Sequence, residues 1–331
     1  MPTKQNNFCP EMLSALKNAN SILLCTHISP DGDAIGSMLS MGLALTALGK
    51  SVVMACGDPV PGQYRFLPGA EDVVTADKLT GRAFDLALSL DAASPGRLGD
   101  CQTAFFAAPK TAQMDHHPDN PLYAQINVVD GNAPAAGCVV YRALTALDAP
   151  ITPDIAAALY CAISTDTGNF RFPSTTPEAF RIMADLLEAG LDLPNTARPI
   201  HALREEPCVR LLGRALNTLR LFGNGKCACM TLRRADYAAA RALPEHNANI
   251  VNYALDMPGV RMAFLAEEMP EEGMVKASLR AAEAPCNVAR IARKYGGGGH
   301  ALAAGLRLRG NLDELCAAIE RDMLQALEDD Q

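Results

Sequence analysis

Short apolar runs that end on metal-ligand types of side chain are the feature that most restricts how this chain can fold. The run Ser21 to Cys25 is followed by residues 27–33, His-Ile-Ser-Pro-Asp-Gly-Asp, which we call the ligand loop. Residues 34–48 then repeat Leu, Met and Ala at helical spacing. A continuously apolar run before such a helix is typical of a buried parallel strand in a βαβ unit. We therefore expect an α/β fold with the ligand loop between a strand and a helix.

Two further apolar runs end on the same kinds of side chain. Residues 83–90 end on Asp91, and residues 111–114 end on Asp115-His116-His117. The carboxyl ends of parallel strands meet at one edge of a sheet, where ligands usually bind and helix N-termini point. We therefore expect these side chains to converge with those of the ligand loop.

The order of the expected elements predicts two domains. Pro194, Pro199 and Pro207 punctuate the region after Gly190 and mark a linker. The predicted organisation is an N-terminal parallel-sheet domain, a helical linker and a smaller α/β C-terminal substrate domain, over residues 1–190, 191–225 and 226–331. Further strands are expected over 50–56, 125–129, 226–232, 259–267 and 273–281. Helices are expected over 11–19, 135–148, 153–164, 177–189, 207–222 and 286–295, with a last strand and helix within 305–329.

Charge and composition restrict the ligands. The 331 residues suffice for two domains with cores of their own, at 49% hydrophobic and 20% charged residues. A formal net charge of −8 argues against binding long duplex nucleic acid, because such binding requires many Lys and Arg to neutralise phosphates. Small phosphorylated ligands remain compatible with this charge.

Targeting signals and cysteine usage predict a cytoplasmic protein. No segment approaches the length of a membrane span, and residues 1–10 lack the apolar core of a signal peptide. The 11 cysteines are odd in number and include no Cys-x-x-Cys pair. We expect buried thiols in a reducing compartment, including Cys227 and Cys229 in a predicted strand.

The candidate metal ligands are carboxylates and imidazoles: His27, Asp31, Asp33, Asp91, His116 and Asp166. This donor set favours Mn²⁺ or Mg²⁺ over structural zinc, which prefers cysteine. Six ligands are too many for one ion, whereas two ions about 3.5–4 Å apart would use them all and suit in-line displacement at phosphorus. We expect Asp91 to bridge the ions. Taken alone, the ligand loop is equally compatible with a solvated turn whose helix is capped by Asp33.

Two residues beside these ligands are candidates for catalysis. His117 is not needed as a ligand, so it could hydrogen-bond a phosphate oxygen or protonate a leaving oxygen. Asp115 is then expected to orient His116. On its own, Asp-His-His is also compatible with a polar strand end.

A glycine-rich run is the second informative stretch. Tyr295 is followed by four glycines, residues 296–299, and then by His300. Such a run loses much backbone entropy on folding, so it indicates close backbone approach or unusual torsions. We expect Gly298, Gly299 and His300 to bind substrate, with Arg280 at a strand end as a planar donor for phosphate. The alternatives are a helix-terminating linker and a solvated arginine.

At these residues the chain resembles the DHH phosphoesterase family. The ligand loop, Asp91, Asp-His-His at 115–117 and Asp166 are similar to the four motifs of that family, in order and spacing. Gly-Gly-Gly-Gly-His-x-x-Ala-Ala-Gly at 296–305 is similar to the motif of its DHH-associated C-terminal domain. The family's Ser-x-Arg-Ser reads Ser-Leu-Arg-Ala here, with Ala281 last, which could alter substrate preference.

The resemblance implies a two-domain enzyme with its active site in the cleft, two divalent cations per chain and possible assembly as a homodimer. Mn²⁺ is the implied metal, with Mg²⁺ and Co²⁺ as alternatives. One ion would be bound by His27, Asp31 and Asp91. The other ion would be bound by Asp33, Asp91, His116 and Asp166.

The short two-domain layout is most similar to family members that degrade oligoribonucleotides of about two to five nucleotides and remove the 3′-phosphate of 3′-phosphoadenosine 5′-phosphate. Relatives of these enzymes hydrolyse cyclic di-AMP or its linear product pApA, which is the first alternative. A pyrophosphatase of the same superfamily and a catalytically silent nucleotide-binding protein are further alternatives.

Overall fold

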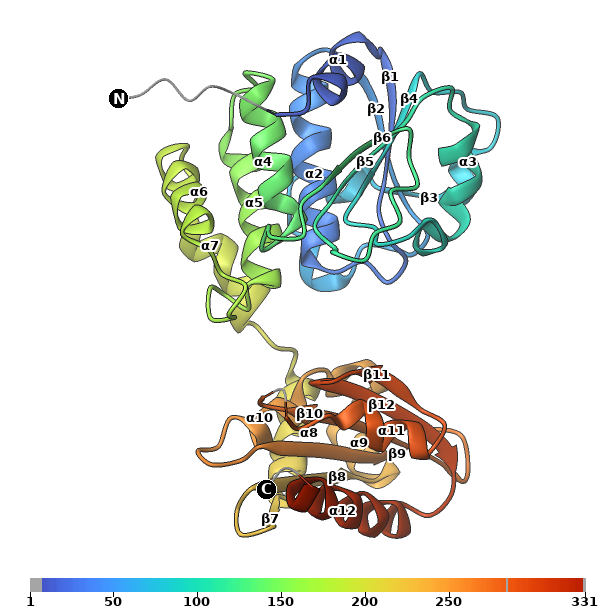
Figure 1. Ribbon diagram of the computed structural model, residues 1–331, viewed down its shortest axis with the longest axis vertical. Coiled ribbons are helices and arrows are strands. Elements are labelled where there is room, and N and C mark those ends of the chain that lie inside the picture. The colour runs from blue at the N-terminus through green and yellow to red at the C-terminus, as the bar shows by residue number, and fades with distance from the viewer. Residues whose placement is uncertain (1–7, 284, 330–331) are drawn as a thin grey trace. The chain divides into compact units, whose positions relative to one another are not determined.

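The protein divides into two compact units, Met1–Leu203 and Arg204–Gln331. The computed structural model describes residues 8–283 and 285–329 (Figure 1). The division lies inside the predicted linker, and the predicted domain limits at 190 and 226 stay predictions. None of the described helices combines the length and the apolar character that crossing a membrane requires. The cytoplasmic location and the homodimer also stay predictions.

A parallel six-stranded sheet forms the centre of the first unit, in the order β3-β2-β1-β4-β5-β6. Its strands are β1 (Ser21–Cys25), β2 (Ser51–Cys56), β3 (Val74–Thr75), β4 (Leu86–Leu90), β5 (Thr111–Asp115) and β6 (Ile126–Val129). β1 pairs with β2 on one side and with β4 on the other, so the chain reverses its direction across the sheet between β1 and β4. In α/β sheets, ligands bind outside the carboxyl ends of the strands at such a reversal.

Helices lie on both faces of this sheet, and α6 and α7 pack outside them against α5. The helices of this unit are α1 (Pro10–Asn18), α2 (Gly32–Ala47), α3 (Gln102–Ala107), α4 (Ala136–Ala146), α5 (Pro153–Asp166), α6 (Pro177–Glu188) and α7 (Leu193–Ala197). Figure 1 shows α2, α4 and α5 on one face and α3 on the other. α2 is buried along most of its length and packs against α5. The expected α/β architecture is therefore confirmed.

The contact between α2 and α5 depends on a glycine. A Cβ atom on Gly36 would lie 2.3 Å from the carbonyl oxygen of Ala158 and 2.6 Å from the backbone nitrogen of Ala162. These distances are too short for any side chain, so the two helices meet backbone to backbone here. The contact lies one turn after the ligand loop on α2 and one turn before Asp166 on α5.

The second unit contains a six-stranded mixed sheet in the order β11-β12-β10-β9-β8-β7. Its strands are β7 (Arg220–Phe222), β8 (Cys227–Leu232), β9 (Met262–Glu268), β10 (Met274–Ala281), β11 (Gly298–His300) and β12 (Ala303–Arg309). Its helices are α8 (Glu206–Asn217), α9 (Arg234–Ala240), α10 (Ile250–Leu255), α11 (Val288–Lys294) and α12 (Leu312–Asp329). β8 and β9 are parallel, whereas β7 with β8, β9 with β10, β10 with β12 and β11 with β12 pair antiparallel.

Alternation along β8 separates two cores on opposite faces of this sheet. Cys227 and Cys229 pack in the core that includes α11 and α12, whereas Ala228 and Met230 pack in the core that includes α8 and α10. Both cysteines are free and buried, as expected for structural thiols.

One expectation about this unit is wrong. The helix predicted over 207–222 ends at Asn217, because the hydroxyl of Thr218 accepts a hydrogen bond from the backbone nitrogen of Thr231 (2.8 Å) and ties the chain to β8. Residues 220–222 then form β7. Residues 298–300 of the glycine-rich run pair with β12 as an edge strand.

We predict that Gly36→Ala destabilises the protein by about 1–3 kcal/mol, because the added methyl group overpacks the contact between α2 and α5. Urea or thermal unfolding followed by circular dichroism would measure the loss. Gly62→Ala is the matched control, since a Cβ there meets no atom within 4 Å. Equal stability of the two variants would contradict this account of the helix contact.

Candidate metal centre

The six predicted ligands converge at the carboxyl ends of β1 and β4 and beside β5. The ligands form two groups, and within each group the donor atoms all lie within 4.8 Å of one another. The first group is His27, Asp31 and Asp91, and the second is Asp33, His116 and Asp166. A third group joins Asp91 with His116 and His117. Side chains from residue 27 to residue 166 are thus gathered by the sheet reversal and by the C-terminal end of α5.

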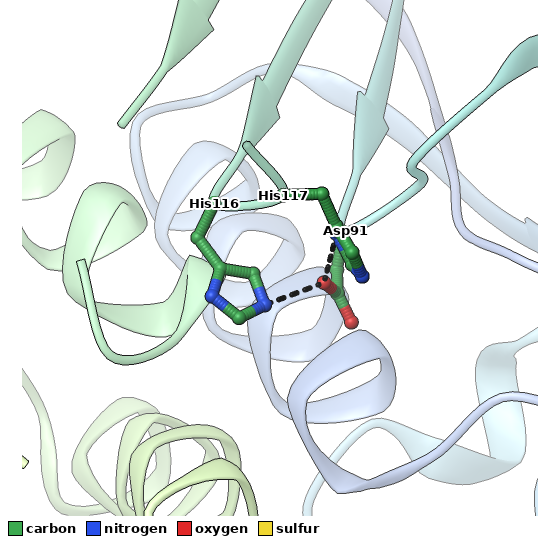
Figure 2. A group of neighbouring side chains, drawn as sticks. All are labelled: Asp91, His116 and His117. Carbon is green, nitrogen blue, oxygen red and sulfur yellow. Dashed lines mark ion pairs between the residues drawn. The ribbon is translucent and has the colours of Figure 1, made fainter. Parts of the chain in front are cut away.

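Asp91 lies between the two groups and presents one oxygen to each. Its Oδ2 is 3.6 Å from Nε2 of His27, and its Oδ1 is 3.5 Å from Nε2 of His116. Figure 2 shows the carboxylate facing His116 and His117. Asp91 adopts a left-handed φ of 53°, which is uncommon for a residue other than glycine and often marks a functional site. A carboxylate in this position is suited to bridge two ions.

Each histidine uses one ring nitrogen to fix its orientation. Nδ1 of His27 is 2.8 Å from the carbonyl oxygen of Ile28, and Nδ1 of His116 is 3.2 Å from that of Ala133. In both rings Nε2 therefore faces the carboxylates. Hydrogen bonding of this kind to the second nitrogen is what holds metal-binding histidines in place.

The two aspartates of the ligand loop have different supports. Asp31 caps α2, because its Oδ1 accepts hydrogen bonds from the backbone nitrogens of Asp33 and Ala34, both at 3.1 Å. The cap is therefore Asp31 and not Asp33. The fully buried Asp33 instead accepts hydrogen bonds from the backbone nitrogens of Ala136 (2.6 Å) and Gly137 (2.9 Å), at the N-terminus of α4. These bonds fix Asp33 and place the positive end of a helix dipole beside it.

The donor atoms have the spacing and the chemistry of a site for divalent cations. The histidine nitrogens lie 3.2–3.7 Å from the carboxylate oxygens. Ligands of an octahedral ion with bonds near 2.1 Å lie about 3 Å apart. Small shifts of these side chains would therefore bring the donor atoms to coordination distance. Oδ1 of Asp91 is buried without a hydrogen-bond partner among the described residues. These residues therefore fit two hard divalent cations.

Positive charge is also needed to stabilise the ionised form of the buried carboxylates in this centre. Burial raises the pKa of Asp166 to about 7, with a further contribution from the negative charge of Asp91. Burial and the charges of Asp91, Asp166 and Asp31 likewise raise the pKa of Asp33. Burial works against a charged His27, but hydrogen bonds to Asp31 and Asp91 prevail and raise its pKa to about 10. Without cations, the centre therefore retains protons.

Asp115 contacts the ring of His117 and not the ring of His116. Its Oδ1 is 2.8 Å from Nδ1 of His117, and Asn120 donates to its other oxygen. The expectation that Asp115 orients His116 is therefore wrong: the neighbouring ring of His116 turns toward Ala133. The hydrogen bond to Asp115 raises the pKa of His117, which favours the protonated ring.

A cavity of about 110 Å³ opens over these groups. Its described lining residues are His27, Asp31, Asp91, Ala93, Arg97, His116, His117 and Asp166. The lining combines carboxylates and imidazoles, which suit metal ions, with a guanidinium, which suits a phosphoryl group. Arg97 was missed by sequence reasoning, because nothing in the sequence distinguishes it from other exposed arginines.

The four predicted substrate residues lie in the second unit. In the sheet register Ala303 pairs with His300 on one side and with Arg280 on the other. Residues opposite one another on neighbouring strands share a face of the sheet, so Arg280 and His300 lie on the same face. A Cβ on Gly299 would lie 2.5 Å from the carbonyl oxygen of Ala303, which explains the glycine there. Gly298 pairs with Gly305 and is exposed.

We predict that Mn²⁺ binds at least about tenfold more tightly at pH 8 than at pH 6. The raised pKa values of His27 and Asp166 mean that both groups hold protons at pH 6, and a metal ion must displace them. Titration calorimetry in two buffers of different ionisation enthalpy would give the affinity and the number of protons released. Equal affinity at both pH values, without proton release, would contradict the assignment.

Comparison with known proteins relates most of the chain to one family. Residues 21–163 match the model of the DHH family N-terminal domain, and residues 236–324 match that of the DHHA1 domain. The chain is 35% identical over 306 residues to a bifunctional oligoribonuclease and PAP phosphatase NrnA of Thermus thermophilus, covering 92% of this chain and 89% of the relative. It is 24% identical to the NrnA of Bacillus subtilis, with coverages of 92% and 98%.

A solved structure has the same fold. An exopolyphosphatase-related protein from Bacteroides fragilis matches with a TM-score of 0.86 and 24% identity, over 95% of this chain and 94% of that one. The family matches cover both units described above, and the ligand loop, Asp91 and Asp-His-His lie within the first of them. The chain therefore belongs to the DHH phosphoesterase family.

Proposed function

We propose that this protein is a metal-dependent hydrolase of short oligoribonucleotides, of about two to five nucleotides, and of the 3′-phosphate of 3′-phosphoadenosine 5′-phosphate. The observation that carries the proposal is the carboxylate of Asp91, which faces one ligand group with each of its oxygens. The names of the Thermus and Bacillus relatives support both substrates. Cyclic di-AMP or pApA as the preferred substrate is the alternative.

In this proposal two Mn²⁺ ions, with Mg²⁺ or Co²⁺ as alternatives, occupy the centre. His27, Asp31 and Asp91 hold one ion, and the other is held by a second set: Asp33, Asp91, His116 and Asp166. When bound, such a pair of ions supplies an activated water molecule and neutralises charge on the phosphoryl oxygens. The chain's own contribution is to fix the ligands, through backbone bonds such as those from α4 to Asp33.

His117 is proposed as the proton donor to the leaving oxygen. Its Nδ1 is held by Asp115, and this contact favours the protonated ring. A protonated His117 can therefore hydrogen-bond a phosphate oxygen and transfer its Nε2 proton as the ester bond breaks. Asp115 orients the ring and stabilises its charge without touching the substrate.

Arg280, Gly298, Gly299 and His300 are proposed to bind the rest of the nucleotide. Burial lowers the pKa of the half-buried Arg280, and one of its amino groups donates to the backbone oxygen of Leu279 (3.0 Å). This bond leaves the remaining N–H groups of the guanidinium for a phosphate or a base. The net charge of −8 favours small substrates over long nucleic acids.

We predict that the purified protein with Mn²⁺ releases mononucleotide from pApA and phosphate from 3′-phosphoadenosine 5′-phosphate. Asp91→Asn should lower both rates by more than about 100-fold, because it weakens both ion sites at once. A time course should include cyclic di-AMP and a long single-stranded RNA, which we expect to be poorer substrates. Binding without turnover in saturating Mn²⁺ would instead establish a silent nucleotide-binding protein.

We predict that Arg280→Ala raises KM for pApA by about 10- to 100-fold, the usual worth of a hydrogen bond to a charged group, and changes kcat less. Arg309→Ala is the matched control, since it removes an exposed arginine from the neighbouring strand β12. Steady-state kinetics of both variants would measure the difference. Equal KM values would argue against substrate binding by Arg280.

A further inference from the structure

Arg97 lies at the rim of the metal centre on a segment that is fixed to the ligand loop. It belongs to the short helical segment η4 (Pro95–Cys101) that follows β4. Its backbone oxygen accepts a hydrogen bond from the backbone nitrogen of Ile28 (2.8 Å). Gly99 packs so closely on Ile28 that a Cβ would lie 2.3 Å from that side chain, and its φ is +54°. The backbone of Arg97 is therefore held in place, while its side chain is exposed.

The side chain of Arg97 contacts His27 at an atom that another group also uses. One guanidinium nitrogen of Arg97 lies 2.8 Å from Nδ1 of His27, and the carbonyl oxygen of Ile28 lies at the same distance from that nitrogen. A guanidinium can only donate a hydrogen bond and a carbonyl can only accept one. A single ring nitrogen therefore cannot satisfy both partners at once.

The carbonyl oxygen of Ile28 keeps the bond. When Nε2 of His27 binds a metal ion, the remaining ring proton is on Nδ1 and is donated to Ile28, as it also is when the ring is protonated. Arg97 therefore has no acceptor on His27. Among the described residues no carboxylate lies within ion-pair distance of this guanidinium, so the metal-loaded protein holds an exposed cation at the rim without a protein partner.

The charge balance of the centre indicates which kind of substrate the guanidinium of Arg97 would favour. The four aspartates of the two ligand groups carry a charge of −4, and two divalent cations would bring the sum to zero. A phosphomonoester carries close to −2 near neutral pH, whereas a phosphodiester carries −1. Of the described residues that line the cavity, Arg97 is the single lysine or arginine.

We propose that Arg97 turns from His27 to the phosphoryl group that is cleaved, and that it favours phosphomonoesters over phosphodiesters. Its planar guanidinium can donate two parallel hydrogen bonds to phosphate oxygens. The dianionic monoester gains more from the added positive charge than the monoanionic diester. Arg97 thereby sets the balance between removal of a terminal 3′-phosphate and cleavage of an internucleotide bond. This inference rests on the proposed function and adds a specificity-determining residue to it.

The test uses the full-length protein with Mn²⁺ and compares Arg97→Gln and Arg97→Lys with the wild type. Arg82→Gln is the control, since it removes an exposed arginine of the same unit that does not line the cavity. Titration calorimetry would measure the affinity for Mn²⁺ and, in the loaded protein, for inorganic phosphate. Kinetics would then give kcat/KM for 3′-phosphoadenosine 5′-phosphate and for pApA.

For Arg97→Gln we expect inorganic phosphate to bind about 10- to 100-fold more weakly, with Mn²⁺ affinity unchanged. The ratio of monoester to diester hydrolysis should fall, and Arg97→Lys should restore part of it because the charge returns without the planar fork.

Any of three results with Arg97→Gln would overturn the inference: unchanged phosphate affinity, an unchanged ratio of the two activities, or a fall in Mn²⁺ affinity, which would mean that Arg97 serves to hold His27. Absence of phosphate binding by the loaded wild type would also overturn it. If the wild type cleaves neither nucleotide, the proposed function fails. The phosphate titration would still test separately whether Arg97 binds a phosphoryl group.

Discussion

Repulsion among four carboxylates is the constraint around which the first unit is built. Asp33 and Asp91 are almost wholly inaccessible to water, and burial together with the charge of Asp91 raises the pKa values of Asp33 and Asp166. Burial of like charges is costly unless cations or hydrogen bonds compensate. The chain supplies part of the compensation, through the backbone N–H groups of α4 that bind Asp33. Divalent cations would supply the rest, so the same arrangement that opposes folding of the bare chain creates the affinity for metal.

The fold solves a problem of assembly, because the ligands are far apart in the sequence. The reversal of strand order between β1 and β4 places His27 and Asp91 at neighbouring strand ends. The backbone contact at Gly36 brings α5, and with it Asp166, against the helix that begins at the ligand loop. Packing in the core and chemistry at the sheet edge are thus joined by two rigid helices, and a small displacement of either would separate donor atoms that now lie 3.2–3.7 Å apart.

The sequence predicted the α/β fold and the convergence of the six candidate ligands, because they lie at or next to the ends of apolar elements and strand ends meet at one edge. It could not predict contacts that depend on the conformation of a short loop. Spacing along Asp115-His116-His117 does not reveal which ring the aspartate meets, since a turn after β5 decides this. Arg97 was missed for a similar reason: only the irregular η4 segment brings it to the rim. β7 and β11 form because they pair with other strands of the second sheet. The pattern of residues within each segment does not predict such pairing.

The division into two units with separate cores has a consequence for how the chain responds to its surroundings. All the candidate ligands belong to the first unit, and ions that bind only the folded state stabilise that state according to their concentration. Binding of metal at this centre would therefore tie the stability of the first unit to the supply of metal in its environment, whereas the second unit relies on the apolar cores on either face of its sheet. A shortage of metal would thus shorten the lifetime of the folded protein as well as lower its activity.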